Sequence, residues 1–191
     1  TTDECKNSWG NDSWVPELNN NTWSDIKNES IDGVYYRSMF IVALANEYLK
    51  QTTEEKLVQR GHTSIKAEVD KYRLEARFMR ALAYSILIDT YGNPPFITEE
   101  HPIGGYMPKQ IGRVEMFKYI ESELLDIESK IAAPRTNEYG RADQGAVWTL
   151  LARLYLNAEV YTKTAKWTEV ITYAKKVITA GYTLSNQYSH L

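Results

Sequence analysis

The sequence DTYGNPPF at residues 89–96 ends a long run of helix-favouring residues with a glycine, an asparagine and two prolines. Gly92 suits the position that follows a helix, and Pro94 and Pro95 cannot continue one, because proline lacks a backbone N–H and its ring fixes φ. Before this point, residues 65–91 carry apolar side chains on more than one helical face. We therefore expect a central helix over 65–91 and a non-helical segment after it.

Four other segments place apolar residues at the spacing of three and four that gives a helix one buried face. They span residues 31–49, 114–131, 143–160 and 165–180. The last of them is expected to start at an N-cap on Thr164 and to bury the apolar side chains of Trp167, Val170, Ile171, Ala174, Val177 and Ile178. In the first, Phe40 and Leu44 widen the apolar stripe. No strand pattern of comparable length competes with these helices.

The spacing of the helices predicts paired hairpins. Helices 143–160 and 165–180 form an antiparallel unit of about 38 residues, close to the 34-residue tetratricopeptide unit. Helices 65–91 and 114–131 form an earlier pair, interrupted by an insert over 93–112 that holds four prolines and three glycines. The predicted fold is all-α, an irregular superhelix of tetratricopeptide-like hairpins with one long Pro/Gly-rich insert.

Composition narrows the functional classes. Apolar residues make up 43% of the chain and charged residues 25%, which is typical of a globular protein. The net charge of −3 gives no basic surface for a nucleic acid, and no run of 18 apolar residues is long enough to span a membrane. The chain starts at Thr1 and ends in YTLSNQYSHL, from which we expect a piece of a longer protein.

Signals for catalysis or for a cofactor are absent from the sequence. It contains no HExxH, GxxxxGK, GxGxxG or GxSxG motif, and its one cysteine, Cys5, has no histidine partner in a recognisable context. Glu99 and Glu100 adjoin the Pro-rich insert and raise the alternative of a glycosidase carboxylate, but that chemistry needs two carboxylates at a defined separation. We predict no catalytic residue, no metal site and no cofactor.

The first 30 residues differ from the rest, because they hold three of the five tryptophans and six asparagines without helical periodicity. Indole rings among amides and carboxylates suit a sugar, whose C–H faces stack on an aromatic ring while its hydroxyls need hydrogen-bonding partners. On this chemistry Trp14, Asp3 and Asp25 are candidate ligand residues. The alternative is that the tryptophans only cover the helical core. We expect an irregular segment over 1–30 and a helical domain over 31–191.

The stretch EARFMRALAYSILIDTYGNPPFITEE at 75–100 resembles the signature of the SusD/RagB family. That signature is an E-x-R-F-x-R-A-x-x-Y helix followed by an aromatic-Gly-x-x-P turn. Its counterparts here are Glu75, Arg77, Phe78, Arg80, Ala81, Tyr84, Tyr91, Gly92 and Pro95. The segment 139–184 resembles the family's second helical pair, and TTDEC at the start resembles a T-D-E segment. Within the family, the details CKNSWG, YYR and NAEVYT are most similar to the starch-binding members.

This resemblance implies a protein that is not an enzyme and that binds a glycan at the bacterial surface, here starch or a malto-oligosaccharide. It implies a lipid anchor in the outer membrane, attached outside this fragment, and a SusC-like TonB-dependent transporter as the partner that receives the glycan. In the starch-binding members a tryptophan before the first long helix stacks on the sugar, and an asparagine follows it. Trp23 and Asn28 resemble these two residues.

Two signature arginines, Arg77 and Arg80, are interpreted as structural, as a clamp from the helix onto the carbonyls of the insert. A different function remains open beside the glycan-binding one. A tetratricopeptide-like scaffold without its own sugar site would bind a protein or peptide on its helix faces rather than through residues 1–30.

Overall fold

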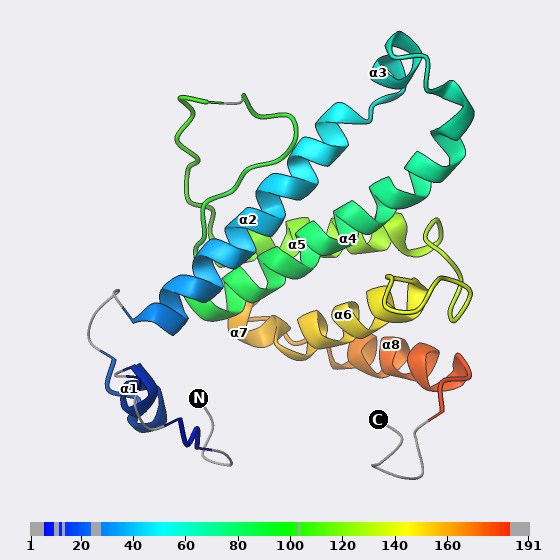
Figure 1. Cartoon of the computed structure of the whole chain (residues 1–191). Coiled ribbons are helices and arrows are strands. Elements are labelled where there is room, and N and C mark those ends of the chain that lie inside the picture. The colour runs from blue at the N-terminus through cyan, green and yellow to red at the C-terminus, as the bar shows by residue number, and fades with distance from the viewer. Residues whose placement is uncertain (1–5, 10–11, 13, 24–27, 103, 184–191) are drawn as a thin grey trace. The chain divides into compact units, whose positions relative to one another are not determined.

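The computed structural model describes residues 6–9, 12, 14–23, 28–102 and 104–183. Over these residues the secondary structure is helical (Figure 1). The elements are α1 (Trp14–Asn20), α2 (Glu29–Gln51), α3 (Glu54–Gln59), η1 (Thr63–Ile65), α4 (Lys66–Tyr91), α5 (Arg113–Glu128), α6 (Gln144–Leu156), α7 (Ala158–Thr162) and α8 (Trp167–Thr179). The all-α prediction is confirmed.

The chain divides into two compact units, residues 1–40 and 41–191, and the division falls inside α2. The expected boundary between an irregular segment ending at residue 30 and a helical domain starting at 31 stays a prediction. None of the helices in the described part of the chain is long and apolar enough to cross a membrane.

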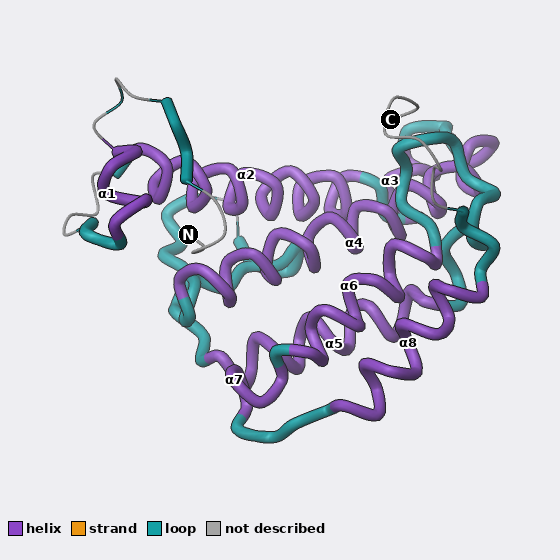
Figure 2. Tube along the Cα trace, turned by 90° about the horizontal axis from the view of Figure 1, so that it is seen from below, coloured by secondary structure: helices purple, strands orange, loops and turns teal. Residues whose placement is uncertain are grey.

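Two antiparallel hairpins form the body of the second unit. Helix α4 packs on α5, and α6 packs on α8, with α5 lying against α6 (Figures 1 and 2). The expected pairing of the helices at 65–91 and 114–131, and of those at 143–160 and 165–180, is therefore confirmed. Small and aromatic residues fill the seam of the first hairpin, where Ala81 and Tyr84 are both fully buried.

The hairpins share a continuous apolar core, because each helix contributes one buried stripe. Each fully buried side chain of this kind stabilises the fold by about 1.5–3 kcal/mol relative to its exposed state. The largest of these side chains in the second unit are Val42, Leu49, Tyr84, Leu87, Ile88, Met116, Phe117, Ile120, Leu124, Ile127, Val147 and Leu151.

The sharp end of α4 follows the prediction. The helix ends at Tyr91, and Gly92 follows with φ of +80°, which a residue with a side chain rarely adopts. A Cβ on Gly92 would also lie 2.9 Å from the guanidinium of Arg113. The described residues of the insert over 93–112 contain no helix, and a single antiparallel bridge between Pro95 and Gln110 closes its base.

The helix expected over 143–160 is divided in two. Asn157 separates α6 from α7, and its backbone N–H donates to the carbonyls of Arg153 and Tyr155. Asparagine is a poor residue for a helix interior, because its short polar side chain competes for backbone groups. The expected cap on Thr164 is wrong: α8 has Lys166 at its N-cap position, and the N–H of Thr164 donates to the hydroxyl of Thr162.

The apolar face of α8 is only partly covered. Tyr173 is buried, and Val170, Ala174 and Val177 beside it are half-buried. The other apolar edge of the stripe is exposed, at 51% for Trp167, 56% for Ile171 and 75% for Ile178. The stripe is wider than the surface that α6 covers, and so the expectation that all six side chains are buried is wrong for these three. Phe40 and Leu44 of α2 are exposed in the same way, at 61% and 54%.

Candidate functional site

The three tryptophans of the first unit lie within or next in sequence to a short helix that the sequence pattern did not predict. Helix α1 begins at Trp14 and buries Val15, and Pro16 is tolerated because it stands in the first turn. Trp14 is half-buried. Trp23 follows this helix with 40% of its surface exposed, and Trp9 precedes it with 68% exposed. Two indole rings of this unit are therefore accessible for stacking in the chain as described.

Asn28 has a structural role that the sequence prediction missed. Its side-chain oxygen accepts hydrogen bonds from the backbone N–H groups of Ser30 and Ile31, and this caps the start of α2. Its side-chain nitrogen donates to Glu17 at 2.7 Å, and the residue is only 5% exposed. Both polar ends of the amide are used within the unit, and so the role of Asn28 in binding a ligand stays a prediction.

Two of the predicted ligand residues, Asp3 and Asp25, lie outside the described residues. Trp14 and Trp23 belong to the same unit, and the hydrogen bonds between Asn7 and Asn19 tie the segment before α1 to that helix at 3.0 and 2.8 Å. The sugar-binding assignment of these residues stays a prediction for all five.

In the second unit, polar side chains hold the base of the insert against the helices. The hydroxyl of Tyr84 donates to the carbonyl of Ile97 at 2.7 Å and accepts from the N–H of the same residue at 2.9 Å. The Asn46 amide donates to the same carbonyl at 3.0 Å, and the Lys50 ammonium donates to the carbonyl of His101 at 3.1 Å. These bonds fix the path of the chain at the point where the insert leaves α4.

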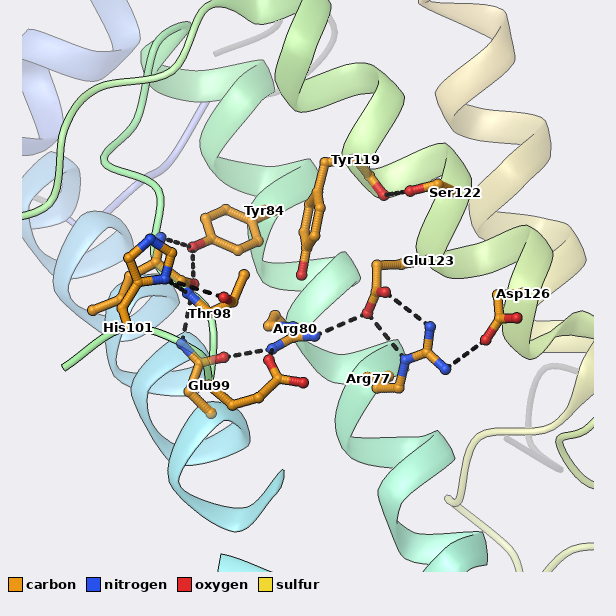
Figure 3. Close-up of polar contacts among 12 residues, drawn as sticks. Arg77, Arg80, Tyr84, Thr98, Glu99, His101, Tyr119, Ser122, Glu123 and Asp126 are labelled. Atoms are coloured by element: carbon orange, nitrogen blue, oxygen red, sulfur yellow. Dashed lines mark hydrogen bonds and ion pairs between the residues drawn. The ribbon is translucent and has the colours of Figure 1, made fainter. Parts of the chain in front are cut away.

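A buried arginine extends this contact (Figure 3). Arg80 is 2% exposed, and its guanidinium reaches Glu99 of the insert, Glu123 of α5 at 3.0 Å and the Asn46 side-chain oxygen at 2.6 Å. One side chain of α4 thereby joins α2, α5 and the insert. A buried charge is tolerated where it is paired and hydrogen-bonded. Both Nη atoms of Arg80 are bonded in this way, whereas its buried Nε has no hydrogen-bond partner among the described residues.

The prediction that Arg77 and Arg80 bind backbone carbonyls of the insert is wrong about their partners. Among the described residues, the side chains that donate to carbonyls of the insert are those of Tyr84, Asn46 and Lys50, and neither signature arginine is among them. Arg80 holds the insert through the carboxylate of Glu99. Arg77 does not touch the insert in any hydrogen bond or ion pair of the described chain. It forms a bidentate pair with Glu123, at 2.8 and 3.1 Å, and a second pair with Asp126 at 2.6 Å.

Aromatic rings pack beside the buried end of this cluster, at Arg80. Phe96 of the insert lies edge-on to Tyr119 with ring centroids 4.7 Å apart, and Tyr84 lies edge-on to Tyr119 at 5.7 Å. Burial raises the pKa of Tyr84 to about 12 and raises that of Tyr119 further, so both phenols are neutral at physiological pH. Ion pairs and ring contacts hold this cluster together, while the buried hydroxyl of Tyr119 has no hydrogen-bond partner in the described part of the chain.

The electrostatics of Glu123 agree with this role. Burial alone would raise the pKa of this carboxyl, but hydrogen bonds from Arg77 and Arg80 outweigh that effect and hold the pKa below its usual value of 4.5. A depressed pKa in the folded state contributes stability above the ordinary pKa, and that contribution is lost as the pH falls through the depressed value.

We therefore expect the Glu123→Gln variant to lose less stability on acidification than the parent protein does. The glutamine carries no proton-linked charge, so the free energy of unfolding should fall less steeply with pH below about 4.5. Urea unfolding at a series of pH values measures the slope. Equal slopes for the two proteins would contradict the assigned role of Glu123.

The acidic side chains of this cluster are used in ion pairs. Glu99, weighed above as a glycosidase carboxylate, is bound to Arg80. Within the described ranges, no group of three or more His, Cys, Asp or Glu side chains is placed to hold a metal ion. In the second unit, the insert leaves the helices after α4, and side chains of α2 and α4 bind its base (Figure 1).

No protein-family model matches the chain. The starch-binding protein SusD of Bacteroides thetaiotaomicron is 37% identical to it over 190 residues, which is 100% of this chain and 32% of SusD. The chain therefore spans about a third of the length of that curated relative.

Solved structures share the fold. A protein crystallised with a xylogluco-oligosaccharide superimposes with a TM-score of 0.75 and 20% identity, over 97% of this chain and 36% of the other. A SusD superfamily protein from Bacteroides fragilis gives a TM-score of 0.67 at 21% identity, over 88% of this chain and 39% of the other. A SusD-like protein from the same species gives 0.60 at 22%, over 80% and 28%. At these identities the likeness concerns the fold.

Proposed function

We propose that this chain, which is 37% identical to starch-binding SusD over 190 residues, is part of a SusD-like protein that binds a glycan without changing it chemically, and that the glycan is starch or a malto-oligosaccharide. The observation that carries the proposal is the 37% identity to starch-binding SusD along the whole chain. The exposed ring of Trp23 supports it, since an accessible indole is the surface on which a glucose face can stack.

We propose a mechanism of capture by stacking. The ring of Trp23 supplies apolar contact, and hydrogen-bonding groups of the first unit orient the hydroxyls of the sugar. By analogy with the stacking of bases on aromatic side chains, one ring contributes about 1–3 kcal/mol. Contacts of this size hold an oligosaccharide while allowing its release.

The surroundings in the cell are part of the same proposal. We infer that the protein is anchored by lipid at the outer membrane and delivers its glycan to a SusC-like TonB-dependent transporter. Only the family resemblance supports this step. Affinity purification of the intact protein from detergent-solubilised outer membranes tests it, because a transporter should be recovered with the protein, and recovery without any transporter would count against delivery.

The Trp23→Ala variant should bind maltoheptaose roughly 5- to 150-fold more weakly than the parent protein, because it loses one stacking surface. Isothermal titration calorimetry on the intact protein measures the change. Trp167→Ala is a matched control, since that indole is also about half exposed but lies on α8 in the other unit. Unchanged affinity in a folded Trp23→Ala protein would remove Trp23 from the site.

A protein-binding scaffold is the alternative function, and the hairpins of α4 with α5 and of α6 with α8 favour it. It predicts that substitutions on helix faces of the second unit change ligand affinity while Trp23→Ala does not. The calorimetric comparison above separates the two functions.

A further inference from the structure

A hollow of about 700 Å³ lies in the second unit, between α4, α6 and α8 and beneath the connection from α5 to α6. Its volume is in the range of small-molecule sites. Phe78 and Leu82 of α4, Leu150 of α6 and Val177 of α8 give it an apolar floor. Polar and charged side chains of the lining come from the connection at 135–143 and from α6.

Of the two acidic residues that line this hollow, the less exposed one, Asp143, already accepts several hydrogen bonds. Asp143 is 9% exposed, and it accepts hydrogen bonds from the N–H of Arg135 at 2.8 Å, the N–H of Ala146 at 3.0 Å and the hydroxyl of Tyr182 at 2.8 Å. The carboxylate therefore has little capacity left for a ligand or for pairing with a cation.

Three arginines line the hollow, and one of them, Arg141, already has carboxylate partners. Arg141 pairs with Glu75 at 2.7 Å and lies 3.7 Å from Glu138. The guanidinium groups of Arg135 and Arg153 differ from it, because neither has a carboxylate within 4 Å among the residues that the structure describes. Two guanidinium groups of the lining therefore have no carboxylate partner among the described residues, while the carboxylates of Glu138 and Asp143 line the same hollow.

Aromatic rings stand at the rim beside these cations. Tyr139 is fully exposed, and Tyr182 is 45% exposed. Both line the hollow together with Arg135. A hollow lined by accessible phenol rings and by guanidinium groups without a carboxylate partner in the described ranges combines a stacking surface for the C–H face of a sugar with a bidentate donor for a carboxylate.

We propose that this hollow is a second saccharide site and that it accepts a sugar bearing a carboxylate, a hexuronate unit. Arg135 and Arg153 donate to the carboxylate groups of the ligand, and Tyr139 stacks on a sugar ring. Since α6 rises by about 1.5 Å per residue, Arg153 stands about 12 Å along the helix from Gly145 at the Arg135 end, so the two cations engage different sugar units of an oligosaccharide.

This site is separate from the proposed glucan contact, which lies in residues 1–40, and the two can fail independently. Trp23→Ala should leave hexuronate binding unchanged. Arg135→Gln should leave maltoheptaose binding unchanged. A loss of only one activity in each variant therefore tells the two proposals apart.

The test is calorimetric titration of the intact protein with trigalacturonate, with maltotriose as the neutral probe of equal length. Arg135→Gln and Arg153→Gln should each weaken trigalacturonate binding about tenfold or more, since each removes a charge-assisted bidentate contact. The matched control is Arg37→Gln, which removes one exposed arginine from α2. Raising the salt concentration should weaken the binding as well.

Arg135 has φ of +65°, and Arg135→Lys keeps the charge at this position should the glutamine variant fold poorly. The lysine variant should bind more weakly than the parent, because a lysine cannot form the bidentate contact. The proposal is overturned if trigalacturonate gives no binding heat, or if it binds with equal affinity to the parent and both glutamine variants. Equal binding of acetyl-Glu-Glu-Glu would overturn the saccharide class.

Discussion

Replacing Arg80 by methionine should lower the free energy of unfolding by about 3–5 kcal/mol, the usual effect of removing one partner from a buried ion pair. The guanidinium is 2% exposed and joins Glu99, Glu123 and Asn46. Methionine fills much of the same space, but it leaves the Glu99 carboxylate without its cation and the Asn46 oxygen without its donor. The base of the insert should therefore loosen along with the loss of global stability.

Chemical unfolding of Arg80→Met measures this effect, and Lys130→Met is its control. Lys130 pairs with Asp126 at 2.6 Å, but both side chains are about half exposed, and such pairs contribute about 0–1 kcal/mol. Hydrogen exchange at Ile97 should speed up in the Arg80 variant and stay unchanged in the Lys130 variant. A loss below about 1 kcal/mol for Arg80→Met would contradict the network described here.

Replacing Leu151 by alanine should lower the free energy of unfolding by about 2–5 kcal/mol, because it opens a cavity in the core of the second hairpin. Leu151 is fully buried on α6. Ile171 on α8 is also apolar and belongs to the face that the sequence predicts as buried for the helix at 165–180, but it is 56% exposed. Ile171→Ala should therefore change the stability of the chain by only about 0.5 kcal/mol.

This pair of variants distinguishes the stability changes expected from the structure from those expected from the sequence periodicity alone. The pattern alone predicts that both substitutions remove core contacts, whereas the structure predicts a large loss for one of them. Thermal or urea unfolding of the two variants decides between these expectations. Equal losses would show that α8 turns a different face toward α6 than the one described.

Sequence reasoning was most successful where single residues have strong local effects. The end of the helix at Tyr91 was predicted correctly, because Gly92, Pro94 and Pro95 act on the backbone whatever surrounds them. The burial of α8 was predicted less well, since its apolar stripe is wider than the face that a single neighbour covers. The break at Asn157 depends on one residue of weak preference inside a strongly periodic segment.

The ion pairs of Arg80 could not be predicted from the sequence for a different reason. Arg80 and Glu99 stand 19 residues apart, and Arg80 and Glu123 stand 43 apart. No local pattern joins such positions, and only the packing of α4 on α5 and on the insert brings them together. The cap on α2 is a contrasting case, because Asn28 in front of a helix is a recognisable start signal that the prediction of a helix at 31–49 overlooked.

The helical hairpins and the proposed ligand surface depend on different kinds of side chain. The hairpins of the second unit are held by buried apolar side chains and by ion pairs, and the ion pairs of Arg80 also hold the base of the insert. The proposed starch contact depends instead on aromatic side chains that remain accessible in residues 1–40. Stability measurements test the first, and only a ligand can test the second.

The most direct test is a crystal structure of the intact protein with maltoheptaose. The account predicts a glucose unit lying flat against the indole of Trp23 in van der Waals contact, with its glycosidic bonds intact. A sugar bound elsewhere, with the Trp23 ring covered by other parts of the protein, would contradict it.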